Sequence, residues 1–417
     1  MEKLAVFCWT LAAPCLIVTG LRCSAALKFI HFRHPFRCLK ESLYTLIRGE
    51  KGAFGALCTA LAGAAGTGNI AGVSTALAVG GAGSLVWMCL FSLLGTATAY
   101  REASLLCPFG GSPMKALKEG MHASLPAAFY AFCLAGCGLA MGCMVQSGAA
   151  AEAMEAAFSM PKWVSGALLA AGALTVLAGG ARLLCATASA LTPLMSLLWM
   201  GLCLLITVLK REALPHALQQ LLYSAAGIKS AAAGFAGAVL TRSIRVGMAR
   251  GVFSNEAGLG SLGLMLGEQE RDPRRCGRLA ALAVCIDTPL MCTLTGLAVI
   301  LATPFANCST PSAVEAIGLV LGQGAARLAA VCTLLFAFGT VIAWSYCGCK
   351  GFAWLTKGKA LWLYRWICCA AAAAGACLQS GLVWGLADCF NALLAFPNCL
   401  LLWQFRTFPL PRTEKKR

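Results

Sequence analysis

Two short runs of glycine and polar residues interrupt stretches of sequence that are otherwise apolar. The first is Gly-Thr-Gly-Asn at residues 66–69, and the second is Phe-Ser-Asn-Glu-Ala-Gly-Leu-Gly-Ser at residues 253–261. Glycine weakens a helix and leaves backbone N–H and C=O groups exposed. Inside a membrane, irregular backbone survives only where it is buried in protein or lines a cavity. Freed carbonyls suit a cation and helix N-termini suit an anion, so both runs are candidate binding elements.

The polar side chains in the two runs distinguish a binding site from simple packing. Glycines alone would also fit a close helix–helix contact, in which small residues let two backbones approach. Asn69, Asn255 and Glu256 would be costly in such a contact, which favours a functional interpretation. Arg250, six residues before Glu256, is the predicted ion-pair partner of that carboxylate.

Other polar residues inside apolar stretches carry more than one interpretation. Asp287 needs a partner or an ion, because an intramembrane carboxylate is unfavourable alone. Gln146 fits either a site or a bridge between helices, and Trp344 either lines a site or packs. The hydroxyls of Thr340 and Ser345 could simply bond to their own helix.

The composition places these runs in a membrane protein. Of the 417 residues, 59% are hydrophobic and only 12% are charged, against about 25% charged in soluble domains. The net charge of +17 does not indicate nucleic-acid binding, because the basic residues form short clusters between apolar spans, as cytoplasmic loops do. The 24 cysteines are scattered through apolar stretches and are expected to pack as small hydrophobic residues.

The order of the apolar segments predicts an all-α polytopic fold. Eleven segments approach the roughly 20 apolar residues that a membrane helix needs. The seventh is too long and too polar to be one straight helix. The segments are 4–26, 53–78, 83–106, 125–150, 161–180, 188–209, 230–266, 279–303, 326–349, 361–379 and 382–403.

The distribution of basic residues predicts the orientation. If residues 27–52 are cytoplasmic, 23 of the 33 lysines and arginines lie inside, six lie outside and four lie within spans. Such a bias follows the positive-inside rule. We therefore expect a multi-pass protein of the cell membrane with its N-terminus outside and its C-terminus in the cytoplasm.

The spacing of the two interruptions predicts a repeat. They lie five helices apart and are entered from opposite sides of the membrane, as in an inverted repeat of five helices whose first helix is discontinuous. The predicted organisation is an extra N-terminal membrane helix at 1–30, a basic cytoplasmic loop at 31–52, a first repeat at 53–209, a second repeat at 230–405 and a basic cytoplasmic tail at 406–417.

The motifs resemble the alanine/glycine:cation symporters, also called sodium:alanine symporters. The resemblance rests on Ala-Gly-Thr-Gly-Asn-Ile-Ala-Gly-Val at residues 65–73 and on the longer run at residues 247–261. Weaker similarities, such as Val-Gln at 145–146 and Phe-Pro-Asn at 396–398, follow in family order. The sequence departs from the family at Gly148, at residues 80–83, and at 262–270.

The resemblance implies sodium-coupled symport of a small neutral amino acid, alanine or glycine, by alternating access, with no enzymatic activity and no cofactor beyond Na+ as the coupling ion. By analogy with the wider fold, the cation would lie between the carbonyls of Ala62 and Ala65 and the Thr340 hydroxyl, and Asn69, Ser254 and Asp287 would form a second polar cluster. The substrate would lie between the broken helices. The residues expected to bind it are Gly66, Thr67, Gly68, Asn69, Gln146, Phe253, Ser254, Asn255, Glu256, Gly258 and Trp344.

Several alternatives stay open. Proton coupling, a different amino acid, or a channel are compatible with the same pattern. A histidine-based enzyme site is disfavoured, because His31, His34, His122 and His216 all lie in or near predicted loops. The phosphate-binding loop of an ATP-driven pump does not occur in the sequence. Stoichiometry and oligomeric state are left undetermined.

Overall fold

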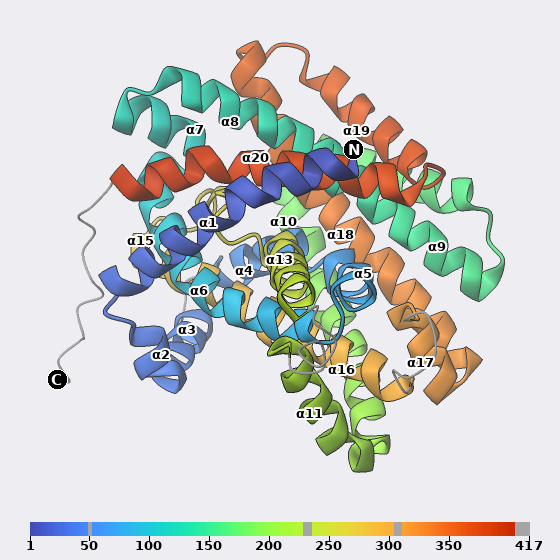
Figure 1. Ribbon diagram of the computed structural model, residues 1–417. Coiled ribbons are helices and arrows are strands. Elements are labelled where there is room, and N and C mark those ends of the chain that lie inside the picture. The colour runs from blue at the N-terminus through green and yellow to red at the C-terminus, as the bar shows by residue number, and fades with distance from the viewer. Residues whose placement is uncertain (49–51, 228–235, 304–310, 405–417) are drawn as a thin grey trace.

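The computed structural model describes residues 1–48, 52–227, 236–303 and 311–404. Every regular element within these ranges is a helix (Figure 1). The predicted tail at 406–417 and the first residues of the predicted 230–266 span lie outside the described residues. An all-helical architecture is what a bilayer requires of an apolar chain, because helices satisfy their backbone groups internally.

Seven helical stretches in the described ranges are long and apolar enough to cross a membrane. Three shorter apolar helices accompany them: α4 (Ala53–Ala64), α5 (Ala71–Gly80) and α19 (Leu361–Gly375). The prediction of an all-α polytopic membrane protein is thereby confirmed, whereas the count of about eleven crossings and the inverted repeat remain predictions. Four of the stretches are single helices: Lys3–Ala26 in α1 (Glu2–Ala26), Lys162–Leu209 in α10, Gln323–Thr356 in α18, and Ser380–Gln404 in α20. The stretch Gly83–Phe109 comprises α6 (Gly83–Leu106) and η2 (Cys107–Phe109). The other two each contain a π-helix: Ser124–Phe158 comprises α8 (Ser124–Cys137), η4 (Gly138–Val145) and α9 (Gln146–Phe158), and Pro273–Ala302 comprises α15 (Pro273–Cys285), η6 (Ile286–Cys292) and α16 (Thr293–Ala302).

Helix α10 (Lys162–Leu209) corresponds to two predicted spans. Its 48 residues would extend about 72 Å at 1.5 Å per residue, more than twice the hydrocarbon thickness. The backbone bends at Gly180, where φ is 63° and ψ is −154°. Only glycine adopts this conformation readily, so Gly180 divides the helix into two segments, as the predicted boundary between 161–180 and 188–209 requires.

The segment predicted as a basic loop at 31–52 contains two helices. They are α2 (Ile30–Arg33) and α3 (Pro35–Arg48), and α3 packs against α15. The other connecting helices are also short. They are α7 (Pro113–Lys115), η3 (Ala116–Gly120), η5 (Arg211–Ala213), α11 (Leu214–Ala225), α14 (Ser261–Leu266) and α17 (Ala313–Leu321).

Helices from opposite ends of the chain pack side by side. The N-terminal helix α1 lies along α20, the last described helix, and also touches α6 (Figure 1). Helix α18 packs against α8, α9 and α10, while α13 (Ala236–Asn255) packs against α5 and α6. The two interrupted segments, α4–η1–α5 and α13–α14, are therefore enclosed by helices distant in sequence.

Close backbone contacts hold this arrangement together. Gly111, at φ +78°, lies directly against Gly267 at the end of α14. A Cβ on Gly267 would come within 2.4 Å of the Gly111 Cα and 2.5 Å of its nitrogen. Because both contacting atoms are backbone, no side-chain rotation can relieve this overlap.

We predict that Gly267→Ala destabilises the protein, by about 1–3 kcal/mol, because an overpacked contact must shift backbone. The measurement is the thermal unfolding midpoint in detergent. Gly201→Ala is the matched control, since a Cβ at Gly201 in α10 meets nothing within 4 Å. A Gly267→Ala protein that melts at or above the wild-type temperature would contradict the tight contact.

Candidate functional site

The first interruption occurs between α4 and α5. Helix α4 ends at Ala64, a 3-10 turn η1 covers Thr67–Asn69, and α5 begins at Ala71. Gly66 is extended, with φ −109° and ψ −155°. A Cβ on Gly66 would lie 2.3 Å from the Thr340 hydroxyl oxygen and 2.9 Å from Gln146 Oε1. Glycine at this position therefore lets α18 and α9 approach the broken backbone.

The second interruption follows α13. Three residues there have positive φ: Glu256 at 58°, Gly258 at 92° and Gly260 at 83°. The Asn255 side chain accepts a hydrogen bond from the Ala257 N–H at 3.0 Å, and its amide donates to Thr288 Oγ1 at 3.2 Å. The short helix α14 then begins at Ser261. The helix is interrupted where the sequence predicts, with the first positive φ at Glu256 and the next two at Gly258 and Gly260.

A buried polar cluster joins the two interruptions. Asn69 donates from Nδ2 to Asp287 Oδ1 at 2.8 Å. The Ser254 hydroxyl lies 2.8 Å from Asn69 Oδ1 and 2.6 Å from Asp287 Oδ2. Thr288 also donates to Asp287 Oδ2, at 2.9 Å. The three residues predicted to form a second polar cluster are thus brought together from η1, α13 and η6.

Two members of the first predicted cation-binding set, Ala62 and Thr340, are in contact. Thr340 donates its hydroxyl to the Ala62 carbonyl at 2.9 Å, so it bonds to α4 rather than to its own helix. Ala65 is buried at the end of α4, and its N–H bonds to the Leu61 carbonyl at 2.6 Å. The α4 terminus thus faces α18, as the analogy implies.

Gln146 holds the first interruption from α9. Its Oε1 accepts from the Thr67 N–H at 2.9 Å and from the Thr67 hydroxyl at 2.8 Å. Gln146 follows the π-helix η4, and Asp287 lies within the π-helix η6. Such wide turns often occur at functional sites, and here each places one polar side chain against a broken helix.

Glu256 has different partners from the one expected. Its Oε1 accepts from Trp344 Nε1 at 2.5 Å, and its Oε2 accepts from the Ser261 hydroxyl at 2.7 Å. The predicted ion pair with Arg250 is wrong, because Arg250 pairs with Asp388 instead. Arg250 lies within α13, about 1.7 turns before Glu256. Glu256 directly follows the end of that helix, and its positive φ directs the carboxyl group away from Arg250.

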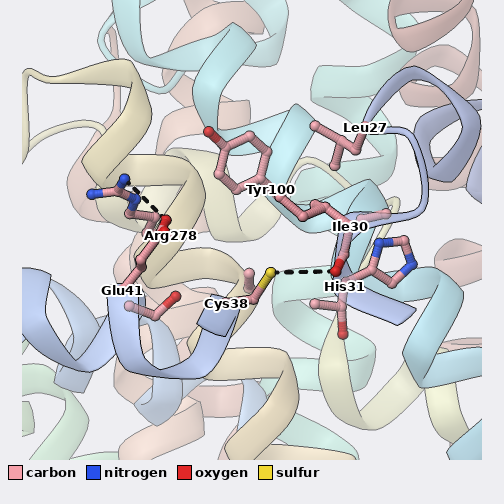
Figure 2. A pocket seen from close by; sticks show the side chains of 11 residues that line it. Leu27, Ile30, His31, Cys38, Glu41, Tyr100 and Arg278 are labelled. Carbon is pink, nitrogen blue, oxygen red and sulfur yellow. Dashed lines mark hydrogen bonds and ion pairs between the residues drawn. The ribbon is translucent and has the colours of Figure 1, made fainter. Parts of the chain in front are cut away.

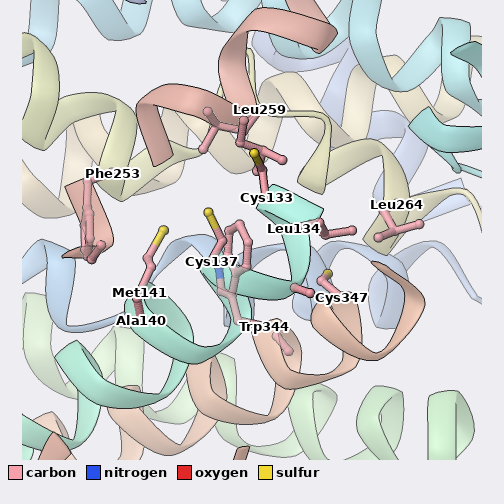
Figure 3. Packing of buried hydrophobic residues seen from close by; sticks show 14 of the residues in the cluster. Cys133, Leu134, Cys137, Ala140, Met141, Phe253, Leu259, Leu264, Trp344 and Cys347 are labelled. Atoms are coloured by element: carbon pink, nitrogen blue, oxygen red, sulfur yellow. The ribbon is translucent and has the colours of Figure 1, made fainter. Parts of the chain in front are cut away.

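Trp344 fixes the position of this carboxylate. It is fully buried in α18, and a Cβ on Gly142 would come within 2.3 Å of the Trp344 Cβ. Figure 3 shows Trp344 among Cys137, Met141 and Cys347, residues of one apolar cluster that also includes Phe253. Gly142 in η4 therefore leaves room for the Trp344 side chain, and the surrounding apolar residues orient the indole N–H.

Phe253 packs directly against the first interruption. A Cβ on Gly68 would come within 3.2 Å of the Phe253 ring and 3.4 Å of the Ser254 Cα. The two broken segments therefore touch here without an intervening helix. All the predicted non-glycine site residues are buried: Ala62, Ala65, Thr67, Asn69, Gln146, Phe253, Ser254, Asn255, Glu256, Asp287, Thr340 and Trp344.

Glu102 is a buried carboxylate that the sequence analysis missed. It lies in α6 and accepts from the Gly258 N–H at 3.0 Å and from Asn398 Nδ2 at 2.9 Å. It thereby ties the second interruption to α20. An acidic residue within an apolar span was the available signal, because such residues are costly unless they have a structural or functional partner.

An ion pair lines a cavity next to this centre. Arg250 and Asp388 have only 8% and 14% of their side chains exposed. The guanidinium also lies 4.6 Å from the centre of the Trp384 ring and 5.4 Å from that of Phe253. These residues border a cavity of about 400 Å³. Helix α1 lines it with Ala5, Val6 and Trp9, and helices α5, α13 and α20 line it with residues that include Thr75, Arg245, Arg250, Trp384 and Asp388.

Three carboxyl groups of the centre lack a basic partner among the described residues. Glu102, Glu256 and Asp287 are fully buried, and none takes part in an ion pair found among the described residues. Their partners are hydroxyl, amide, indole and backbone donors. In their ionised form, buried carboxylates without basic partners would stabilise a positive ion brought into the same low-dielectric region.

Several known proteins are similar to this chain over most of its length. The chain is 33% identical to a transporter of Haemophilus influenzae, covering 98% of this chain and 93% of the relative. It is 32% identical to the sodium/alanine symporter AgcS of Methanococcus maripaludis, covering 84% and 81%. It is 28% identical to a probable sodium/glutamine symporter, GlnT, of Bacillus subtilis, covering 93% and 84%.

The match to a family extends over nearly the whole sequence. Residues 1–409 fit the sodium:alanine symporter family, and both interrupted helices and the buried polar cluster lie within that range. Together with the apolar helices, this makes the chain an integral membrane protein, and it belongs to the sodium:alanine symporter family.

Proposed function

We propose that this protein carries a small neutral amino acid, alanine or glycine, together with Na+ across the cell membrane by alternating access. The observation that carries the proposal is the buried meeting of two broken helices, bridged by Asn69, Ser254 and Asp287. In sodium-coupled transporters of inverted-repeat type, discontinuous helices of this kind bind the substrate and the ion. The proposed architecture is two inverted five-helix repeats preceded by α1.

The proposed substrate site lies between Gly66–Asn69 and Phe253–Gly258. The N-terminus of the ten-residue helix α5 offers free N–H groups and a positive dipole end to the substrate carboxylate. Glu256 offers a negative charge to the substrate ammonium. Phe253 and Trp344 wall the site, and both are fully buried, so only a small side chain fits beside them.

The proposed sodium ligands are oxygen atoms, which hard cations prefer. One set is the carbonyls of Ala62 and Ala65 with the Thr340 hydroxyl, and Asn69 and Asp287 supply a second. The Thr340–Ala62 bond of 2.9 Å would be replaced by a shared ion. Because α4 contributes to the ion site and η1 to the substrate site, each ligand stabilises the same arrangement of the broken helix, which couples their binding.

We propose two gates for the transport cycle. The outer gate is Arg250–Asp388 with the rings of Phe253 and Trp384, whose centres lie 4.9 Å apart. At the other end of the site, Lys350 lies 2.5 Å from Glu268, which also accepts from Tyr346. Opening these ion pairs in turn would expose the centre to each side. The cavity lined by the start of α1 is extracellular if the N-terminus is outside.

The name of one relative favours a second candidate substrate, glutamine. Glutamine needs a larger cavity than alanine and a polar partner for its side-chain amide. Competition measurements separate the two candidates. The proposed site predicts strong competition by alanine and glycine, and weak competition by glutamine, leucine and phenylalanine.

We predict Na+-dependent uptake of labelled alanine by proteoliposomes that contain the purified protein. An inward Na+ gradient should drive accumulation, and choline in place of Na+ should abolish it. Alanine affinity should also be higher in Na+, by about 5–150-fold if the coupling is typical of linked sites. Equal affinity and equal uptake in the two salts would exclude sodium coupling and leave proton coupling as the alternative.

We predict that Glu256→Gln strongly reduces Na+-driven uptake while the protein still inserts and elutes as a folded species. Glutamine keeps the size and an acceptor for Trp344, but it removes the charge that faces the proposed ammonium. Uptake should fall at least about tenfold, the factor that corresponds to 1.4 kcal/mol. Glu155→Gln is the control, because Glu155 is half exposed and pairs with Lys162 at 3.3 Å, away from the proposed site. Wild-type transport with unchanged Na+ dependence would remove the charge of Glu256 from the cycle.

We predict that the Arg250–Asp388 gate shows strong coupling in a double-mutant cycle. Arg250→Gln and Asp388→Asn should each slow uptake, because each leaves one buried charge without its partner. The combined neutral pair should be less impaired than the two single effects predict. The measurement is the initial rate of uptake at saturating alanine, with equilibrium binding measured in parallel. Additive effects, or wild-type rates in both single variants, would show that the pair is not a gate.

A further inference from the structure

In helix α3 polar side chains face the rest of the protein and apolar side chains face outward, the reverse of an amphipathic helix on a soluble protein. Ser42 and Thr45 face inward and are only 6% and 7% exposed. Phe36 and Ile47 face outward and are 84% and 80% exposed. Leu39 and Leu43 are also exposed, and their spacing places them on the same helical face as Phe36 and Ile47. The apolar face of α3 is therefore turned away from the rest of the chain.

A basic flank borders this apolar face. Arg37 and Lys40 are both exposed and lie about 40–100° around the helix from Phe36, at 100° per residue. Lys28 and Arg33 precede the helix in the same connection and are also largely exposed. An exposed apolar face with a basic border is the pattern of a helix that lies in the interface of a bilayer.

The position of α3 agrees with an interfacial helix. In chain order it follows α1 and α2 and precedes α4, so it lies between two apolar segments. Its 14 residues extend about 21 Å, too short to cross. Its inner side is fastened to α15: Arg278 lies 3.3 Å from Glu41 and 3.4 Å from the Thr45 hydroxyl. Figure 2 shows Arg278 and Glu41 beside the small pocket between α3, α6 and α15.

We propose that α3 binds the headgroups of anionic phospholipids through Arg37 and Lys40, with Phe36, Leu39, Leu43 and Ile47 inserted among the acyl chains. The apolar face identifies the occupant as lipid, and the basic border selects headgroups with a net negative charge. The proposal is independent of the proposed transport activity, because it concerns the surface of the protein and not its centre.

Glu41 connects lipid binding to the body of the protein. Arg37 lies 3.0 Å from Glu41 Oε1, and Arg278 lies 3.3 Å from its Oε2, so two basic residues share one carboxylate. When Arg37 binds a lipid headgroup, it no longer pairs with Glu41, and the Glu41 carboxylate pairs with Arg278. Anionic lipid therefore fastens α3 more firmly to α15, and the backbone of α3 opens less often.

The test is hydrogen exchange of the α3 amides, measured by mass spectrometry on full-length protein in nanodiscs that each hold one copy. Discs of phosphatidylcholine are compared with discs that also contain phosphatidylglycerol. We expect slower exchange in the anionic discs, by roughly fivefold for each basic side chain that engages a headgroup. Inorganic phosphate added to phosphatidylcholine discs should not reproduce the effect, because the apolar face requires the ligand to be a lipid.

Two variants and one matched control complete the experiment. Arg37→Gln with Lys40→Gln should abolish the difference between the two disc types, whereas Phe36→Ser with Ile47→Ser should speed exchange in both. Lys210→Gln with Arg211→Gln removes an equally exposed basic pair elsewhere and should change nothing. Equal exchange in both disc types for the wild type, or an anionic effect that survives Arg37→Gln with Lys40→Gln, would overturn the proposal. The same measurement is repeated in larger discs that hold two copies. Protection of α3 that appears only in those discs would also overturn the proposal, because a second copy of the chain would then cover the apolar face.

Discussion

Backbone groups released by a broken helix have no water to bond with inside a bilayer, and this constraint organises the centre of the molecule. The Thr67 N–H bonds to Gln146, the Ala257 N–H to Asn255, and the Gly258 N–H to Glu102. Each of these acceptors is a buried polar side chain. Without them, each unpaired group would cost several kcal/mol in a hydrocarbon environment. The breaks and the polar residues around them therefore depend on one another.

The buried carboxylates follow from the same constraint. Asp287 is held by Asn69, Ser254 and Thr288, and Glu256 by Trp344 and Ser261. These donors are neutral, and no lysine or arginine in the described part of the chain pairs with either carboxyl group. In the proposed function, a cation beside these carboxyl groups and the substrate would complete one site together, which would couple the binding of the two.

Glycine and alanine allow these contacts to form at all. Gly66 lies against Thr340, Gly68 against Phe253, and Gly142 against Trp344, each at a separation that a side chain would fill. Small residues have a similar role in helix packing throughout membrane proteins. In this protein they also bring hydrogen-bonding groups of different helices within reach, so close packing and polar satisfaction are parts of one arrangement.

The sequence by itself determined the membrane class, the approximate helices and the two interruptions, because hydropathy and glycine content act over a few neighbouring residues. Family motifs also pointed to Asn69, Ser254 and Asp287 as one cluster, which the structure confirms as a set of contacts. Only the tertiary structure decided the partners of charged residues. Arg250 pairs with Asp388, 138 residues away, and Glu102 reaches Asn398, 296 residues away. The positive φ of Glu256 turns its carboxyl group toward Trp344 and away from Arg250, six residues earlier in the sequence. Which charged residues pair inside a helix bundle depends on which helices pack together. The spacing of residues along one segment does not reveal which distant helix lies beside it.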